Sequence, residues 1–297
     1  MVAIRRILCP TDFSEFSKGA LEQAIVLGRR YRAEIACVCV IPTLAPPTVG
    51  FALPPAYDAR ARDTALAELG RFAAPAVAAG FEVRLEVREG NVANAIVDLA
   101  RELPADLVVM GTHGLSGFER LMLGSVTEKV LRRAPCPVLT VPRRVHEAGA
   151  TPHAAFERVL CPLDFADPSQ QALRVAMSLA SERPSRLVLL HVQEDPMGGG
   201  IGDWSSWTVP EYRRALEEHA RERLHAALDP ADRSGLCVEE VLATGKPYAE
   251  ILRVAEERAC DLIVMGTHGS AIGKALFGST AQHVVRGATC PVLTVRS

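Results

Sequence analysis

The feature that most constrains this chain is an internal repeat. Residues 7–13, Ile-Leu-Cys-Pro-Thr-Asp-Phe, return as Val-Leu-Cys-Pro-Leu-Asp-Phe at residues 159–165. Two further matched pairs follow in the same order, 106–114 with 261–269 and 134–141 with 288–295. Because three segments recur in one order, the 297 residues contain two copies of one domain, each of ordinary domain size.

The boundary between the copies is predicted at residues 146–153. This stretch is short and polar and contains Pro152, as is typical of a linker between domains. We therefore expect the first domain at 1–145 and the second at 154–297.

Within each copy, short apolar runs alternate with segments that carry apolar residues at helical spacing. In the first copy the predicted strands are 4–9, 34–40, 81–87, 106–110 and 137–141. The predicted helices are 16–32, 58–79, 91–102 and 125–133. Apolar strands that are joined by helices form parallel sheets with helices on both faces. The pattern predicts an α/β fold of two tandem, doubly wound, open parallel sheets, each in a three-layer α/β/α domain.

The composition limits the function classes. Hydrophobic residues make up 48% of the chain and charged residues 23%, as in ordinary globular proteins. The formal net charge of −2 provides no attraction to nucleic acid or to an anionic membrane, and no apolar run approaches the ~20 residues of a membrane span. The eight cysteines lie mostly in strand-like runs without zinc-ligand spacing, so we expect free thiols, no metal site and a cytoplasmic location.

Polar residues and glycines gather in the first copy where two strands are expected to end and where a helix is expected to begin. The segments are Pro10-Thr11-Asp12 after the first strand, Met110-Gly111-Thr112-His113-Gly114 after the fourth, and Gly124-Ser125-Val126-Thr127 at the helix start. In an open α/β sheet, ligands bind beyond the carboxyl ends of the strands. We therefore expect the three segments to face one site.

These segments are suited to an anion. Glycine at Gly111, Gly114 and Gly124 allows positive φ and close approach of a bound group to the backbone. The helix that begins at Ser125 presents unpaired N–H groups and the positive end of its dipole. The glycines could instead be turn residues, and Ser125 and Asp12 simple N-caps. Each simpler interpretation is favoured singly, but their placement at one sheet edge favours a phosphate site, with Asp12 toward ribose hydroxyls or a bridging cation.

The glycines match neither of the common nucleotide motifs. No Gly-Lys-Ser or Gly-Lys-Thr follows a strand, and no dinucleotide-binding glycine triplet follows the first strand. His113 and His268 hold equivalent positions in the two glycine loops, where a histidine could touch a phosphate or act as a base. No nucleophile with an orienting carboxylate accompanies them, so we predict no catalytic residue.

Both copies resemble domains of the universal stress protein family, and nearly the full chain resembles a tandem member. The glycine spacing of the first copy, two residues between Gly111 and Gly114 and nine more before Gly124, is similar to the motif of the ATP-binding branch. The resemblance implies a flavodoxin-like or adenine nucleotide alpha hydrolase-like fold with strand order 3-2-1-4-5. It also implies ATP, with or without Mg²⁺, across the first and fourth strands, with Asp12 at the nucleoside and Val40 at adenine.

The complete set of predicted ATP-binding residues covers both copies. In the first copy they are Pro10, Thr11, Asp12, Val40, Met110, Gly111, Thr112, His113, Gly114, Gly124, Ser125, Val126 and Thr127. In the second they are Asp164, Val192, Met265, Gly266, His268, Gly269, Gly278, Ser279 and Thr280. Only eight residues separate Gly269 from Gly278, and Leu163 replaces Thr11. Because the shorter loop could move the start of the helix, binding in the second copy and a degenerate site are equal alternatives.

The resemblance also implies partners. The family pairs domains through their last strands, here 138–141 against 292–295 within one chain, and a homodimer of whole chains is left open. We predict an adenine nucleotide as ligand, an unidentified protein partner, and a role as a nucleotide-dependent regulator in stress response or growth arrest. The alternatives are a slow ATPase that uses the same site and a dimerising scaffold that binds no nucleotide.

Overall fold

The computed structural model describes most of the chain. The described residues are 4–42, 55–114, 123–142, 156–181, 185–194, 209–267 and 277–296. They form two compact units, one containing Ala3–Ala154 and the other Ala155–Ala288. The predicted linker, His268 and Gly269 lie outside the described residues.

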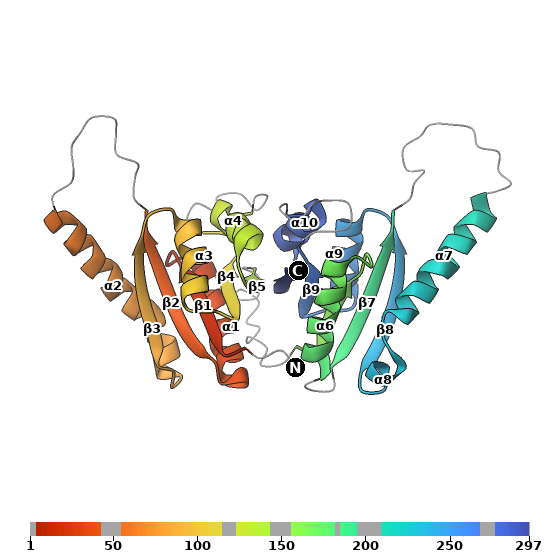
Figure 1. The fold of residues 1–297 in the computed structure, drawn as a ribbon, viewed down its shortest axis with the longest axis horizontal. Helices are drawn as coiled ribbons and strands as arrows, with labels where there is room; N and C mark the ends of the chain where they lie inside the picture. The colour runs from red at the N-terminus through yellow and green to blue at the C-terminus, as the bar shows by residue number, and fades with distance from the viewer. Residues whose placement is uncertain are drawn as a thin grey trace, which may run out of the picture. The chain divides into compact units, whose positions relative to one another are not determined.

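The first domain alternates strands and helices, as the sequence predicts. Its elements are β1 (Arg6–Thr11), α1 (Glu15–Tyr31), β2 (Glu34–Ile41), α2 (Pro55–Ala78), β3 (Val83–Glu89), α3 (Val92–Glu102), β4 (Leu107–Gly111), α4 (Ser125–Arg133) and β5 (Val138–Val141). The strands are parallel in the order β3-β2-β1-β4-β5, which confirms the predicted 3-2-1-4-5 order. Helices α1 and α2 pack on one face of the sheet and α3 and α4 on the other (Figure 1).

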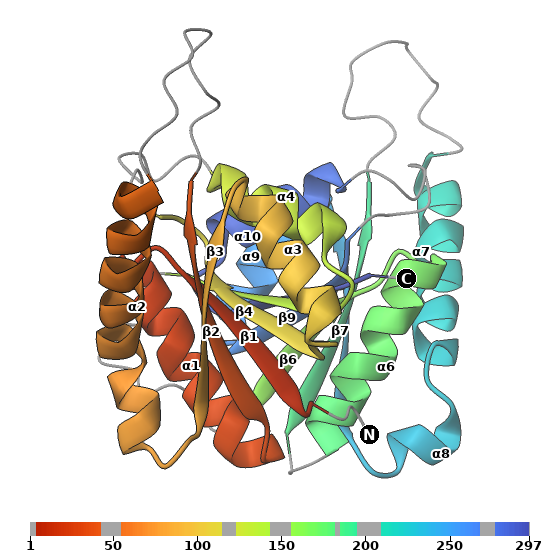
Figure 2. The same cartoon turned by 60° about the vertical axis from the view of Figure 1, so that its left-hand side comes forward.

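The second domain repeats this plan with one addition. Its elements are β6 (Arg158–Pro162), α6 (Asp167–Ser181), β7 (Arg186–Gln193), α7 (Val209–Ala226), α8 (Pro230–Arg233), β8 (Cys237–Thr244), α9 (Pro247–Glu257), β9 (Leu262–Gly266), α10 (Ser279–Gly287) and β10 (Val292–Val295). Its strand order, β8-β7-β6-β9-β10, matches that of the first domain. The addition is α8, a short helix between α7 and β8 (Figure 2).

The central strands form the core of each domain because both of their faces are covered. In β4 every residue is buried, and Leu8 of β1 and Val108 of β4 expose no surface. Leu160 of β6 and Ile263 of β9 are equally inaccessible in the second domain. Strands covered on both faces read as continuous apolar runs, which is why these segments are uniformly apolar in the sequence.

A repeated aspartate fixes the register of the central strands at their amino ends. The Asp106 carboxylate accepts the backbone N–H groups of Arg5 at 2.8 Å and Arg6 at 2.9 Å. The Asp261 carboxylate accepts those of Glu157 at 2.7 Å and Arg158 at 3.1 Å. Hydrogen bonds to an ionised acceptor are among the stronger ones in proteins. This part of the repeated sequence therefore maintains the fold, whereas the repeated glycines lie at the other end of the strands.

Candidate functional site

The candidate site lies where the strand order of the first domain reverses. Strand β1 has β2 on one side and β4 on the other, which makes its carboxyl end the expected crevice of a doubly wound sheet. A cavity of about 280 Å³ opens there, just below the ~300–1,000 Å³ typical of small-molecule sites. It is lined by Pro10, Thr11, Asp12, Ser17, Val38, Val40, Val92, Ile96, Met110, Gly111, His113, Gly114, Gly124, Ser125, Val126 and Thr127.

The structure therefore brings together the predicted residues of the first domain around one cavity, with the exception of Thr112. Thr112 is buried behind the lining, and its hydroxyl pairs with His113 Nδ1 at 2.9 Å. Its carbonyl oxygen accepts the Gly124 N–H at 3.0 Å. Thr112 thus supports the glycine loop through its backbone and does not border the cavity.

Four lining residues were missed by the sequence reasoning. Val38 precedes Val40 by two positions, so the alternation of β2 places both on one face of the sheet. Val92 and Ile96 are four residues apart on α3 and lie on one face of that helix. These two periodicities were visible in the sequence. Ser17 had no such signal, because its position depends on the turn that joins β1 to α1.

The amino end of α4 forms one wall of the cavity. Gly124 is the N-cap of α4 and provides no side-chain cap, so the first N–H groups of the helix are available to a ligand. Ser125 and Val126 follow it along the lining. The Thr127 hydroxyl donates to Gly111 O at 3.0 Å. Because its hydrogen is engaged there, Thr127 has its backbone N–H rather than its hydroxyl to offer a phosphate.

Two glycines permit close packing at the end of β4. A Cβ at Gly111 would lie 2.7 Å from Phe16 Cβ and 3.0 Å from the Phe16 carbonyl carbon. A Cβ at Gly114 would collide with Asp12 Oδ2. Glycine at these positions therefore brings the fourth-strand loop against the turn after β1 and the first turn of α1. Close approach of a ligand to the same backbone stays a prediction.

The Asp12 carboxylate is held by the residues that begin α1. Phe13 adopts a left-handed backbone conformation with φ of 65°, which turns the chain sharply after β1. Asp12 Oδ1 then accepts the Ser14 backbone N–H at 3.1 Å, the Ser14 hydroxyl at 2.6 Å and the Ser17 hydroxyl at 2.5 Å. The carboxylate is therefore fixed before any ligand arrives.

The ring of His113, a residue of the glycine loop, lies against α1. Its ring is tilted against Phe16, with ring centroids 5.3 Å apart, and it lines the cavity. With Nδ1 engaged by Thr112, the imidazole is oriented by the protein and can contact a bound ligand. This arrangement provides an oriented polar contact and does not identify a nucleophile.

The second domain retains the hydrogen bond that joins the end of β9 to the start of α10. The described predicted residues are Asp164, Val192 near the end of β7, Met265 and Gly266 at the end of β9, and Gly278, Ser279 and Thr280 at the start of α10. Gly278 N–H donates to Thr267 O at 2.8 Å, the same bond that anchors α4 in the first domain. The loop that is one residue shorter therefore leaves this anchor of α10 in place.

The surroundings of the second aspartate are different. Asp164 is exposed, and among the described residues its carboxylate has one hydrogen bond, from Ala166 N–H at 3.0 Å. Ala166 stands where the first domain has Ser14. The Ser169 hydroxyl, equivalent to that of Ser17, donates to Ala166 O at 2.9 Å and not to the carboxylate.

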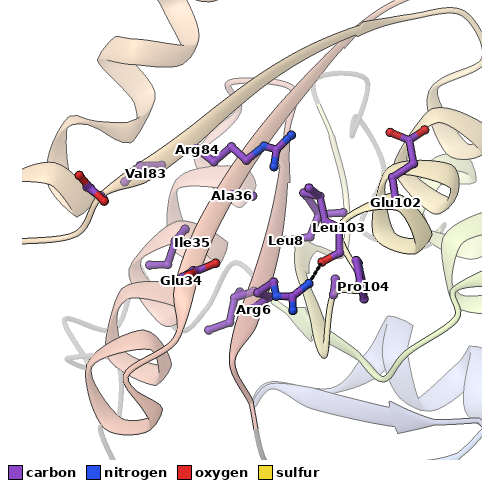
Figure 3. A pocket seen from close by; sticks show the side chains of 13 residues that line it. Arg6, Leu8, Glu34, Ile35, Ala36, Val83, Arg84, Glu102, Leu103 and Pro104 are labelled. Carbon is purple, nitrogen blue, oxygen red and sulfur yellow. Dashed lines mark hydrogen bonds between the residues drawn. The ribbon is translucent and has the colours of Figure 1, made fainter.

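A larger cavity, of about 710 Å³, lies at the opposite, amino end of the first sheet (Figure 3). Its charged lining residues are Arg6, Glu34, Glu82, Arg84 and Glu102. Arg6 donates to the Leu103 carbonyl at 2.6 Å, and Arg84 donates to Glu86 at 2.7 Å. Because its lining combines two arginines with three glutamates, this cavity favours neither an anion nor a cation. The smaller cavity at the carboxyl ends remains the candidate site on chemical grounds.

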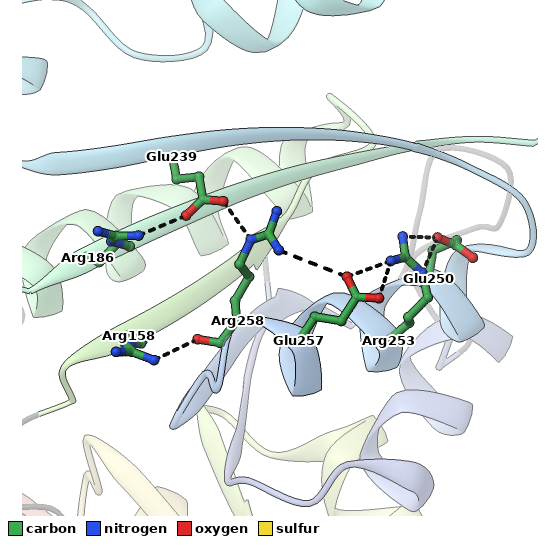
Figure 4. Close-up of polar contacts among 7 residues, drawn as sticks. All are labelled: Arg158, Arg186, Glu239, Glu250, Arg253, Glu257 and Arg258. Atoms are coloured by element: carbon green, nitrogen blue, oxygen red, sulfur yellow. Dashed lines mark hydrogen bonds and ion pairs between the residues drawn. The ribbon is translucent and has the colours of Figure 1, made fainter.

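Ion pairs occupy the equivalent position in the second domain (Figure 4). Arg258 donates from Nε to Glu239 at 2.6 Å, and Arg186 donates to the same carboxylate at 3.2 Å. The Arg258 carbonyl accepts a hydrogen bond from Arg158 at 3.2 Å. The first domain has Leu103 at the position equivalent to Arg258. It therefore lacks the guanidinium group that pairs with Glu239 in the second domain.

Three further features of the described residues concern membrane spans, metal sites and cysteines. None of the helices in the described parts of the chain is both long and apolar enough to cross a membrane. Among the same residues, no group of three His, Cys, Asp or Glu side chains is arranged to hold a metal ion. The eight cysteines are free thiols, as expected, but Cys237 is exposed and Cys136 is partly exposed.

Comparisons with known proteins agree along the chain. The model of the universal stress protein family matches residues 3–142 and 155–296. Universal stress protein MJ0531 of Methanocaldococcus jannaschii is 38% identical over 142 residues, which cover 46% of this chain and 81% of the relative. A universal stress protein of Mycolicibacterium smegmatis is 29% identical over 225 residues, 73% of this chain and 70% of the relative.

The fold has a counterpart among solved structures. The crystal structure of a universal stress protein from Archaeoglobus fulgidus superposes with a TM-score of 0.68. The two chains are 24% identical, and the match covers 98% of this chain and 96% of the other. This likeness concerns the fold, and the chemistry of the site depends on the residues described above.

Proposed function

The chain belongs to the universal stress protein family, and we propose that its first domain binds ATP at the carboxyl ends of β1 and β4. One observation supports this most strongly. A single cavity is lined by the carboxylate that follows β1, by the glycine loop that follows β4 and by the uncapped amino end of α4. These three segments are far apart in the sequence, and each suits a different part of a nucleotide.

The cavity lining includes both apolar and polar groups. Val38, Val40, Val92 and Ile96 provide an apolar surface against which a base could pack. The first N–H groups of α4 provide donors and a positive dipole end for phosphate oxygens. Asp12 carries an acceptor-only carboxylate that suits hydroxyl donors. The described residues thus fit ATP from base to phosphate, and a Mg²⁺ ion would arrive bound to the phosphates.

We expect the nucleotide to act as a regulatory ligand. Binding would add contacts between the glycine loop, α1 and α4, and so would favour one arrangement of the surface that meets a protein partner. A role in stress response or growth arrest follows from the family resemblance. The pairing of the domains through their last strands remains a prediction of the same origin, and the cytoplasmic location remains a prediction from the free cysteines.

Calorimetric titration of the nucleotide-free full chain tests the proposal. ATP, AMP and a cyclic adenine nucleotide are each titrated into the wild type, into Gly114→Ala and into Gly269→Ala. In Gly114→Ala the added methyl group would displace the Asp12 carboxylate, so we expect ATP affinity at the first domain to fall at least about tenfold. A second binding event that only Gly269→Ala removes would show that the second domain also binds.

Two outcomes support the alternatives. If the wild type binds no nucleotide, the proposal fails and a dimerising scaffold becomes the better account. If the wild type hydrolyses ATP steadily, and His113→Ala abolishes turnover while keeping ATP affinity, the site is that of an ATPase. We expect binding without appreciable turnover.

A further inference from the structure

We infer that Ser14 and Ser17 are positioning residues that orient Asp12, so that the first domain selects ribonucleotides over deoxyribonucleotides and the second domain does not. The inference rests on the proposed function, because it assigns a specificity to the same cavity. It concerns residues that the glycine pattern does not include.

The two serines and the aspartate form a closed hydrogen-bonded group. Each serine hydroxyl donates to Asp12 Oδ1, at 2.6 Å from Ser14 and 2.5 Å from Ser17. Each hydroxyl also accepts a backbone N–H at 3.3 Å, Ser14 from that of Ser17 and Ser17 from that of Asp12. Both serines are buried. In such surroundings a connected group of hydrogen bonds is rigid, and losing one member weakens the others.

The consequence is a fixed rotation of the carboxylate. Three donors converge on Oδ1, and Oδ2 is the oxygen next to Gly114, where an added Cβ would collide with it. Asp12, Ser17 and Gly114 all line the cavity. An ionised carboxylate accepts hydroxyl groups and repels phosphate oxygens. The group therefore presents an oriented acceptor to a ribose and leaves the phosphates to α4.

The second domain provides an internal comparison. Ala166 replaces Ser14 and removes one hydroxyl, while the Ser169 hydroxyl donates to the backbone of Ala166. The exposed Asp164 carboxylate has a single hydrogen bond among the described residues, from the Ala166 N–H. An acceptor that can rotate loses more freedom when it binds a hydroxyl, so it contributes less to affinity. The aspartate is repeated in the sequence, but its orientation is not.

The test compares ATP with 2′-deoxy-ATP and 3′-deoxy-ATP by calorimetry on the full chain. A hydrogen bond to a charged acceptor is worth roughly ten- to a hundredfold in affinity. We therefore expect at least one deoxy analogue to bind the first domain of the wild type about tenfold or more weakly than ATP. The measured quantity is the ratio of the affinity for ATP to the affinity for that deoxy analogue. In the double variant Ser14→Ala/Ser17→Ala, ATP affinity should fall while affinity for the deoxy analogue changes little. The ratio should then lie within about twofold of one.

The control is Ser169→Ala, which removes the equivalent hydroxyl of the second domain and should leave the ratio unchanged. Thermal melting checks that each variant is folded. Should the double variant fail to fold, Ser17→Ala keeps the Ser14 N-cap of α1 and is expected to lower the ratio in the same direction.

The outcomes separate the inference from the proposed function. A wild type that binds no ATP contradicts the proposed function. A wild type that binds ATP and both deoxy analogues equally overturns the inference alone. An equal loss of affinity for ATP and for the deoxy analogue in the serine variants would also overturn the inference. That result is expected if Ser14 and Ser17 only maintain the local structure.

Discussion

Replacing Gly111 by alanine tests how closely α1 must approach the end of β4. The new Cβ would lie 2.7 Å from Phe16 Cβ, 3.0 Å from its carbonyl carbon and 3.1 Å from its carbonyl oxygen. Carbon atoms in favourable contact are ~3.5–4.0 Å apart. Two of the three atoms belong to the backbone of α1, so no change of rotamer relieves the overlap. The first turn of α1 must move away from β4.

The cost can be estimated from known effects of overpacking. Added methyl groups in well-packed cores typically cost about 1–3 kcal/mol. For a domain of ~150 residues, each kcal/mol lowers the melting temperature by roughly 2–4 °C. We therefore expect the first domain of Gly111→Ala to melt several degrees below that of the wild type. ATP affinity should fall as well, because Ser17 lies in the turn that has to move.

Two other glycines provide matched controls. Gly266→Ala makes the equivalent change in the second domain, where the new Cβ would lie 2.9 Å from both the carbonyl carbon and the Cβ of Pro168. Gly70→Ala adds a methyl group in α2, where Leu85 Cδ1 lies at 4.0 Å. Alanine is favoured over glycine inside a helix by up to ~1 kcal/mol, so this variant should match or exceed the wild type in stability.

Calorimetric melting of the three variants decides between the possibilities. Gly111→Ala and Gly266→Ala should each lower one melting transition, and Gly70→Ala should lower neither. The melting temperature of Gly111→Ala could instead equal that of the wild type, or exceed it as is expected for Gly70→Ala. In that case, close packing of α1 on β4 is not what requires glycine at position 111.

Three further predictions concern thiols and ion pairs. Cys237 is exposed, so a maleimide should label one cysteine of the native protein rapidly. Rapid labelling of several cysteines would contradict the burial of the others. Burial raises the pKa of Cys136 to about 12, from 9.0, so the unfolded thiol ionises first above pH 9 and Cys136 alone should lower stability by up to ~1.4 kcal/mol per pH unit from there toward pH 12. Because burial also raises the pKa of other thiols, such as Cys260, Cys136→Ala should remove only its own share of this fall in urea titrations. Arg258→Leu, which breaks the partly exposed pair with Glu239, should cost no more than about 1 kcal/mol of unfolding free energy, and a loss above ~2 kcal/mol would contradict this.

The order of the elements could be predicted because periodicity and repetition are properties of the sequence itself. Strand ends were less predictable. The first strand was expected at 4–9 but runs from Arg6 to Thr11, because its ladder with β2 continues to the pair Thr11 and Cys39. The hydrogen bonds of a neighbouring strand decide where β1 ends. As a result, Pro10 and Thr11 belong to the strand and Asp12 is the first residue beyond it.

Site residues were predictable where backbone geometry selects the residue type. Glycines and a helix start leave a spacing that can be recognised, as at Gly111 and Gly124. Ser17 reaches the cavity only through the turn into α1, and no spacing in the sequence encodes this contact. The difference between Asp12 and Asp164 also needed the structure, since it lies in which atoms the neighbouring hydroxyls contact.

The most direct test of the central claim is a crystal structure of the full chain grown with ATP and Mg²⁺. The account predicts nucleotide in the first domain, with phosphates at the backbone N–H groups of Ser125 and Val126, a ribose hydroxyl on Asp12 Oδ2 and the base against Val38 and Val40. Nucleotide in the cavity at the amino ends of the strands, or phosphates directed away from α4, would contradict it.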